Sequence, residues 1–207
     1  MAGQHSGAGL VTIEPLCFVG GTRILTAFGE VRIEDLAIDD LVLTCDGRTA
    51  PVRWIGRQTV SRTFADPLRR LPIRIKAGAL EEDVPSRDLL LSRCHAVRVA
   101  GVLIQAGALV NGASVVRETD VPETFSYYHV ELDDHSLILA EGVASETFID
   151  NADRMAFDNW GEHLALYPGG RDIEEMPLPR AQSHRQVPEA IRRTLAARAA
   201  ANAAMAA

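Results

Sequence analysis

Cys17 stands in a local sequence that suits a nucleophile. The segment reads Pro15-Leu16-Cys17-Phe18-Val19-Gly20-Gly21. A glycine pair allows the backbone to adopt unusual dihedral angles close to the thiol, and a thiolate can attack a carbonyl carbon. Most cysteines, however, are small buried apolar residues. Cys17 therefore predicts covalent chemistry only if other groups act with it.

A hydroxyl and an imidazole follow an apolar strand further along the chain. Ser92 and His95 are three positions apart, directly after Leu89-Leu90-Leu91, where a turn is expected. An imidazole can protonate a departing amide nitrogen near neutral pH, and a serine hydroxyl can hydrogen-bond the same peptide group. A histidine at the end of a strand is more often an ordinary residue, so this pair also needs a nucleophile beside it.

A third group of polar residues alternates along one later segment. In an extended strand His129, Glu131, Asp133 and His135 would share one face, opposite Tyr128, Val130 and Leu132. The simplest interpretation is a solvated polar face over a buried apolar one. The alternative is a divalent metal site, since imidazoles and carboxylates are competent ligands. Residues spaced by two along a flat strand spread too far for all four to surround one ion.

Short strands separated by turns must position these residues. Most of the predicted strands alternate in polarity or are rich in β-branched residues, and Asp-Gly, Asn-Gly, Asp-Pro and Ala-Gly pairs separate them. The region from Cys17 to about Asp150 is therefore predicted to be an all-β module. The predicted strands are 22–26, 41–44, 52–55, 73–75, 88–91, 96–99 and 127–132.

An internal echo suggests that this module is duplicated. Shifting the sequence by the 73 positions that separate Thr22 from His95 aligns the strand 22–26 with 95–99, and 36–42 with 109–115. Any two β segments resemble each other at this level, so the echo alone does not decide the matter. If the duplication is real, the residues near Cys17 and His95 hold related places in two halves and can meet at the centre.

The remaining residues form a different kind of segment. Residues 151–187 are rich in proline, glycine and acids, which predicts an irregular arm. Residues from Pro188 onward have high helix propensity, with Ile191 and Leu195 on one weak apolar face. We therefore divide the chain into residues 1–16, a domain over 17–150 and a C-terminal arm over 151–207 that ends in a helix.

Composition excludes several classes of protein. With 21 Lys and Arg against 28 Asp and Glu among 207 residues, the net charge of −7 argues against nucleic-acid binding. No apolar run approaches the roughly 18 residues of a membrane span, and the first sixteen residues do not resemble a signal peptide, so a cytoplasmic location is expected. Three cysteines, none in a Cys-x-x-Cys spacing, predict neither a disulfide framework nor a structural zinc site.

Taken in order, these segments resemble a Hint domain, the module shared by Hedgehog autoprocessing domains and inteins. The likeness covers about residues 17–150 and is closest to the bacterial Hedgehog/intein-like branch. Three blocks of sequence carry it. The first consists of residues 17–26, 29–36 and 40–44, and the second of residues 52–57 and 88–95. The third consists of residues 132–135, Ala140-Glu141-Gly142 and Glu146-Thr147-Phe148.

The resemblance implies a β-rich, horseshoe-like fold of two pseudo-symmetric halves, and it implies a mechanism. The Cys17 thiolate would attack the carbonyl of Leu16 and convert the peptide bond into a thioester. His95 matches the histidine that protonates the departing nitrogen, and Ser92 stands where the family usually has threonine. Asp133 and His135 match an acidic and a histidine position of the last block.

The resemblance also limits what is expected. Inteins end in a His-Asn pair whose asparagine cyclises, whereas this chain has Ala144-Ser145-Glu146 there, so protein splicing driven by asparagine is not expected. Arg57-Gln58-Thr59 lies roughly where Hedgehog proteins have the aspartate that activates a sterol, so a sterol acceptor is not expected either. Water or a small nucleophile would then accept the acyl group. The substrate would be the chain's own N-terminal segment, and no cofactor, no metal and no turnover of an external substrate are expected.

Two other functions stay open on the sequence alone. The chain can be a catalytically inactive Hint scaffold that acts as a binding or secretion-associated module, with residues 151–207 as the contact arm. It can also be a metal-dependent hydrolase centred on His129 and His135.

Overall fold

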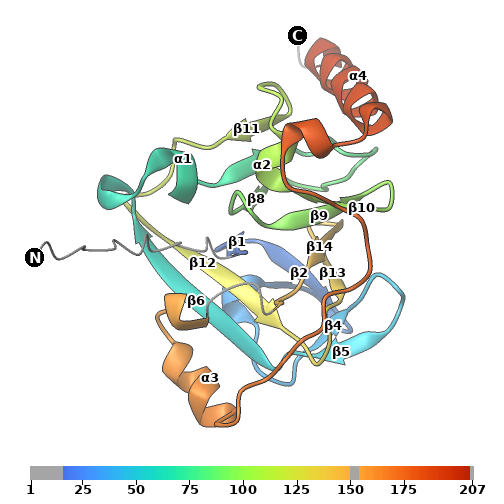
Figure 1. Ribbon diagram of the computed structural model, residues 1–207. Coiled ribbons are helices and arrows are strands. Elements are labelled where there is room, and N and C mark those ends of the chain that lie inside the picture. The colour runs from blue at the N-terminus through green and yellow to red at the C-terminus, as the bar shows by residue number, and fades with distance from the viewer. Residues whose placement is uncertain (1–15, 150–153, 206–207) are drawn as a thin grey trace, which may run out of the picture.

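Residues 16–149 and 154–205 are the part of the chain that the structure, a computed structural model, describes (Figure 1). In chain order the strands are β1 (Phe18–Val19), β2 (Arg23–Thr26), β3 (Gly29–Arg32), β4 (Leu41–Leu43), β5 (Thr49–Pro51), β6 (Trp54–Ser61), β7 (Ile73–Ile75), β8 (Leu89–Leu91), β9 (Ala96–Val99), β10 (Val102–Gln105), β11 (Val115–Arg117), β12 (Thr124–Glu131), β13 (Leu137–Ala140), β14 (Val143–Glu146) and β15 (Arg180–Ala181). The helices are α1 (Pro67–Arg70), α2 (Ala106–Leu109), α3 (Trp160–Leu166) and α4 (Glu189–Met205), with 3-10 turns η1 (Ile33–Asp35), η2 (Arg62–Phe64), η3 (Arg154–Ala156) and η4 (His184–Gln186).

These strands form two sheets, which confirms the predicted all-β class with a helical C-terminal extension. One sheet has six strands in the order β11-β7-β8-β1-β12-β6. The other has nine, in the order β15-β10-β9-β14-β13-β2-β4-β5, with β3 paired to β2. Each predicted strand overlaps an observed one, although β6 extends to Ser61 where the pattern predicts an end at Ile55. The hairpin of β13 and β14 is not among the predicted strands.

The two halves of the fold repeat each other at the spacing of the sequence echo. In one hairpin Arg23 of β2 pairs with Arg32 of β3, and in the other Ala96 of β9 pairs with Gln105 of β10. The second pair lies 73 positions after the first, residue for residue. Asp39 and Gly112, also 73 positions apart, both take a positive φ, of 71° and 75°. The echo therefore reflects a structural duplication.

The long strands β6 and β12 lie side by side at one edge of the six-stranded sheet and form a ladder of eight residue pairs, from Thr124 opposite Ser61 to Glu131 opposite Trp54. The prediction of a solvated polar face on this segment is wrong, because His129 and Glu131 are fully buried. Alternation places the two residues on one face, but residues from the C-terminal segment, of which the structure describes 154–205, cover that face. This strand is buried on both sides near its end.

The short strand β1 lies at the centre of the same sheet. Phe18 pairs with Leu91 of β8 on one side and with Tyr128 of β12 on the other, and it is fully buried. A residue that precedes β1 is therefore held between two neighbours from different halves of the chain.

Gly56 allows a close contact between β6 and the C-terminal segment. A Cβ atom built there would lie 2.7 Å from Phe157 Cδ1 and 2.8 Å from Trp54 Cη2. The Trp54 and Phe157 rings meet edge to face with centroids 5.3 Å apart, so neither ring can give way cheaply.

We therefore expect Gly56→Ala to lower the free energy of unfolding by about 1–3 kcal/mol through overpacking. The matched control is Gly161→Ala in α3, where a Cβ would meet nothing within 4 Å. That change is expected to be neutral or slightly stabilising. Urea denaturation of both variants measures the difference, and equal stabilities would show that the contact at Gly56 is not tight.

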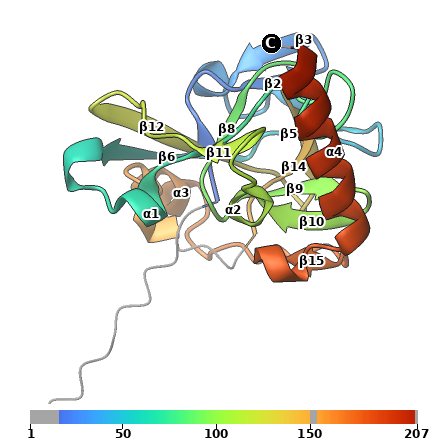
Figure 2. The same cartoon turned by 90° about the horizontal axis from the view of Figure 1, so that it is seen from above.

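The C-terminal segment is built into the fold. Strand β15 pairs in parallel with β10, and α4 runs along one side of the molecule (Figure 2). Ile191 and Leu195 of α4 are buried in the main core cluster, which confirms the predicted helix and its apolar face. Within residues 16–149 and 154–205, no helix is long and apolar enough to cross a bilayer.

Candidate functional site

Cys17 immediately precedes β1 and is fully buried, and Leu16 before it is 5% exposed. Ser92 binds both backbone groups of Cys17. The Cys17 N–H donates to Ser92 Oγ at 2.8 Å, and the Ser92 N–H donates to the Cys17 carbonyl at 2.8 Å. The nitrogen of the Leu16–Cys17 peptide bond thus has a fixed hydroxyl partner.

A tight turn places His95 beside this peptide bond. The His95 N–H donates to the Ser92 carbonyl at 3.1 Å, which links the end of β8 to the start of β9. The His95 ring packs on Phe18 with ring centroids 4.3 Å apart, and the Leu16 backbone lies close enough to favour the charged form of the ring. The structure thus gathers Cys17, Ser92 and His95, three of the five residues that the sequence singles out, around one peptide bond.

Burial sets the charge of both reactive groups. It lowers the pKa of His95 from 6.5 to about 4, against the opposing effects of Glu146 and the Leu16 backbone. It also raises the pKa of the Cys17 thiol well above 9.0, and Arg70 offsets this only in part. At neutral pH the site therefore holds a neutral thiol, which can give up a proton, and a neutral imidazole, which can accept one.

Glu146 is a buried carboxylate behind His95, and no local sequence pattern predicts a role for it. The N–H of Ala96, the residue after His95, donates to Glu146 Oε1 at 2.7 Å. Glu146 Oε2 accepts a hydrogen bond from Arg180 Nη2 at 2.7 Å and faces His135 Nε2 at 3.7 Å. Burial would raise the pKa of Glu146, but His135, His95 and Arg180 outweigh it and lower that pKa. The only sequence signal for Glu146 is its place in the last block of the resemblance.

His129 lines the same region as a neutral ring. It packs edge-on to His95 with centroids 5.8 Å apart and parallel to Phe157 at 6.4 Å. Burial lowers its pKa well below 6.5, and His95, His135 and Arg154 add to the effect. Neither ring nitrogen of His129 or of His95 has a hydrogen-bond partner in the described ranges 16–149 and 154–205.

The other two predicted residues lie in different surroundings. His135 faces Glu146, as described, and its Nδ1 accepts from the Met176 N–H at 3.0 Å. Asp133 is 57% exposed at its side chain and forms ion pairs with Arg53 at 2.8 Å and Arg171 at 3.0 Å. The structure therefore places His135 behind His95, on the far side of Glu146, and Asp133 in an ion-pair network at the surface.

The geometry does not fit the metal site considered for this segment. Glu131 is committed to Arg154 at 3.1 Å, His163 at 3.2 Å and Arg171 at 3.3 Å. Outside residues 1–15, 150–153 and 206–207, no group of three or more His, Cys, Asp or Glu residues is arranged to hold a metal ion.

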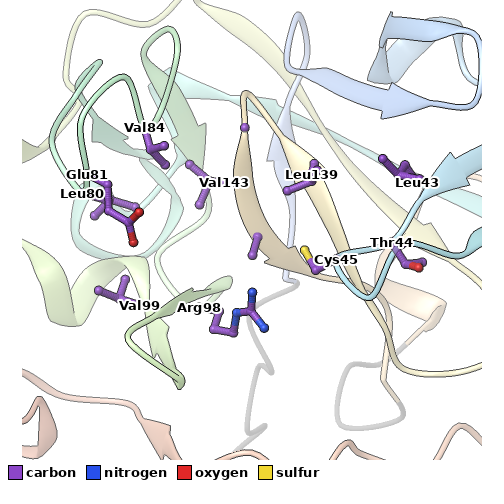
Figure 3. Close-up of a pocket in the computed structure, with 13 residues that line it drawn as sticks. Leu43, Thr44, Cys45, Leu80, Glu81, Val84, Arg98, Val99, Leu139 and Val143 are labelled. Atoms are coloured by element: carbon purple, nitrogen blue, oxygen red, sulfur yellow. The ribbon is translucent and has the colours of Figure 1, made fainter.

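A separate pocket of about 350 Å³ opens elsewhere, between Cys45 and Arg98 on one side and the loop at Leu80, Glu81 and Val84 on the other (Figure 3). Burial raises the pKa of the half-buried Cys45 thiol, while Arg98 lowers it. Cys17, Ser92 and His95 do not line this pocket. Cys45 therefore supplies an independent thiol for control experiments.

Ser92→Ala removes the acceptor of the Cys17 N–H. An unpartnered buried N–H costs about 1–3 kcal/mol, so we expect a loss of stability of that size. Ser92→Thr keeps the hydroxyl and is expected to retain the stability. Thermal unfolding compares the two variants, and equal stabilities of alanine and threonine would contradict a role for the hydroxyl.

The buried histidines predict that stability falls in mild acid. A histidine with a pKa of about 4 in the folded chain and about 6.5 in the unfolded chain stabilises the fold fully above pH 6.5. That contribution, on the order of 3 kcal/mol for His95, is lost as the pH falls from 6.5 toward 4. We expect urea denaturation to show lower stability at about pH 4.5 than at about pH 7, and a smaller loss in His95→Gln. The exposed His184→Gln is the control, and constant stability across this range would refute the prediction.

Comparison with known proteins supports the likeness seen in the sequence. A family model described as "Hint domain" matches residues 16–152. Among solved structures the chain is similar to the MchDnaB-1 intein, at 16% identity and a TM-score of 0.43 over 63% of this chain and 99% of that one. It is also similar to a bacterial intein-like domain from Clostridium thermocellum, at 18% identity and a TM-score of 0.45 over 64% and 98%. A DnaB intein from Synechocystis sp. PCC 6803 is 12% identical with a TM-score of 0.44 over 65% and 100%. The comparison with curated proteins finds no match.

Proposed function

Because this chain belongs to the Hint domain family, we propose that it cleaves its own backbone at the Leu16–Cys17 bond through an N–S acyl shift. The observation that carries this proposal is the hydrogen bond from the Cys17 N–H to Ser92 Oγ, with the His95 ring beside the backbone of Leu16. A nucleophile, a hydrogen-bond partner for the leaving nitrogen and a proton carrier thus converge on one peptide bond.

The first step converts an amide into a thioester. The Cys17 thiol gives its proton to the neutral His95, and the sulfur forms a bond to the carbonyl carbon of Leu16. The bond from that carbon to the Cys17 nitrogen then breaks, and His95 returns the proton to this nitrogen, which becomes an amine. The step is an isomerisation, so no atom is gained or lost.

Ser92 orients the bond that breaks. Its hydroxyl oxygen accepts the Cys17 N–H, which fixes the rotation of the peptide group relative to His95. In the uncleaved chain, burial of Leu16 and Cys17 keeps bulk water away from the Leu16 carbonyl.

Water or a small nucleophile completes the reaction. Water adds to the Leu16 carbonyl carbon, the carbon–sulfur bond breaks, and the products are a Leu16 carboxylic acid and the restored Cys17 thiol. Ala144-Ser145-Glu146 offers no asparagine for the cyclisation that ends intein splicing. We therefore propose cleavage without ligation of the flanking segments.

Intact-mass spectrometry tests the proposal. The purified chain is incubated with and without dithiothreitol and hydroxylamine, which attack a thioester far faster than an amide. The expected result is loss of residues 1–16, accelerated by either reagent. A chain that keeps its full mass under both reagents would instead favour the alternative, an inactive Hint scaffold that serves as a binding or secretion-associated module.

A further inference from the structure

Glu146 joins the reactive histidine to the C-terminal segment. It ends β14, which pairs with β9 through Ser145 and Val97, so its carboxylate reaches the backbone of Ala96 just after His95. On its other oxygen it accepts from Arg180, the first residue of β15. The side chain is fully buried, so water does not screen these contacts.

The hydrogen bonds of His135 define which of its nitrogens faces Glu146. The Met176 N–H donates to His135 Nδ1 at 3.0 Å, so Nδ1 is an acceptor and a neutral ring carries its proton on Nε2. Nε2 is the atom 3.7 Å from Glu146 Oε2. One carboxylate therefore meets the proton-bearing side of His135, an arginine and the backbone at His95.

We propose that Glu146 is a positioning residue for the self-cleavage, holding His95 ready to take up a proton, and that Arg180 of the C-terminal segment opposes it. This inference rests on the proposed function, because the proton in question is the one that passes from the Cys17 thiol to the leaving amine. It gives the C-terminal segment, through Arg180, an electrostatic part in the chemistry, in addition to any part in binding a partner.

The charges around His95 support these opposite effects. The groups that act on the ring come from several elements: Glu146 on β14, Arg180 on β15, the Leu16 backbone before β1, and His129 on β12. Glu146 raises the pKa of His95 toward the operating pH, and Arg180 lowers it. An imidazole whose pKa lies nearer the operating pH transfers protons more effectively.

Two variants should therefore act in opposite directions. Glu146→Gln keeps the acceptor for the Ala96 N–H but removes the negative charge, and it is expected to slow cleavage at pH 7 by roughly tenfold. Arg180→Gln removes the opposing charge, and it is expected to move the acid limb of the pH–rate profile to higher pH. The pH–rate profile of the double variant should lie between those of the single variants. Because the double variant leaves neither charge unpaired, it also tests whether a single variant fails only through misfolding.

The histidine itself can be titrated without cleavage. In a Cys17→Ala background, which stays intact, the His95 ring signals are followed by NMR as the pH is lowered. We expect the midpoint to fall with Glu146→Gln and to rise with Arg180→Gln. The matched control is Glu141→Gln, because Glu141 is also a buried carboxylate that accepts from one backbone N–H, that of Arg23, and from one arginine, Arg87.

The two readouts separate the two ideas. Opposite shifts in both the titration and the pH–rate profile support the inference. If the His95 midpoints of Glu146→Gln and Arg180→Gln equal that of the Glu141→Gln control, the inference is overturned, even if the wild-type chain cleaves. An intact wild-type chain would overturn the proposed function, and with it the role in cleavage, even if the His95 midpoint still responds to Glu146.

Discussion

Cys17→Ala is expected to abolish cleavage, lowering its rate by roughly a thousandfold or more. Without the sulfur no thioester can form, and hydrolysis of an ordinary amide is negligible on the time scale of the assay. The chain should therefore keep residues 1–16 under conditions in which the wild type loses them. Intact-mass spectrometry over a time course measures both rates in parallel.

Cys45→Ser is the matched control for this loss. Cys45 is also a free thiol, but it lies in the pocket of Figure 3, and neither Ser92 nor His95 lines that pocket. This variant should cleave like the wild type. Continued cleavage in Cys17→Ala would assign the chemistry to another residue and would refute the mechanism.

Glu131→Gln is expected to cause the largest loss of stability, about 3 kcal/mol or more. The fully buried Glu131 carboxylate is the shared partner of Arg154, His163 and Arg171, all of which come from the C-terminal segment. Removing its charge takes from Arg154 and Arg171 a fully buried carboxylate that they share, and breaking a buried ion pair at one partner costs far more than the pair itself contributes. Urea denaturation at neutral pH measures the change.

Asp133→Asn is the matched control, because Asp133 pairs with the same Arg171 but is 57% exposed at its side chain. An exposed pair contributes about 0–1 kcal/mol, so this variant should keep nearly all of its stability. If both variants lost the same amount, burial of Glu131 would not be the cause.

The residues near Cys17 and the duplication could be predicted because their signals are local or repeated. The Gly20-Gly21 pair, the strand before Ser92 and the echo between Thr22 and His95 each need only a short stretch of sequence. The echo predicts that the second half repeats the pairing of the first, and the registers of β2 with β3 and of β9 with β10 do correspond.

The part of the site behind His95 could not be predicted because its contacts join distant parts of the chain. Glu146 meets Arg180 across 34 positions, and Met176 meets His135 across 41. Alternation along β12 shows that His129 and Glu131 share a face, but it cannot show whether solvent or another segment covers that face. The irregular appearance of residues 154–187 concealed the arginines that cover it.

The duplicated hairpins also differ in how they avoid aggregation. Strand β3 reads Gly-Glu-Val-Arg, with charged residues along a margin that pairs only with β2 in the described part of the chain. Its counterpart β10 reads Val-Leu-Ile-Gln, an apolar strand of the kind that would recruit another chain if left open. Strand β15 covers this open side. The C-terminal segment therefore protects the edge of β10 from pairing with another chain. A chain shortened before Arg180 would be expected to self-associate through β10.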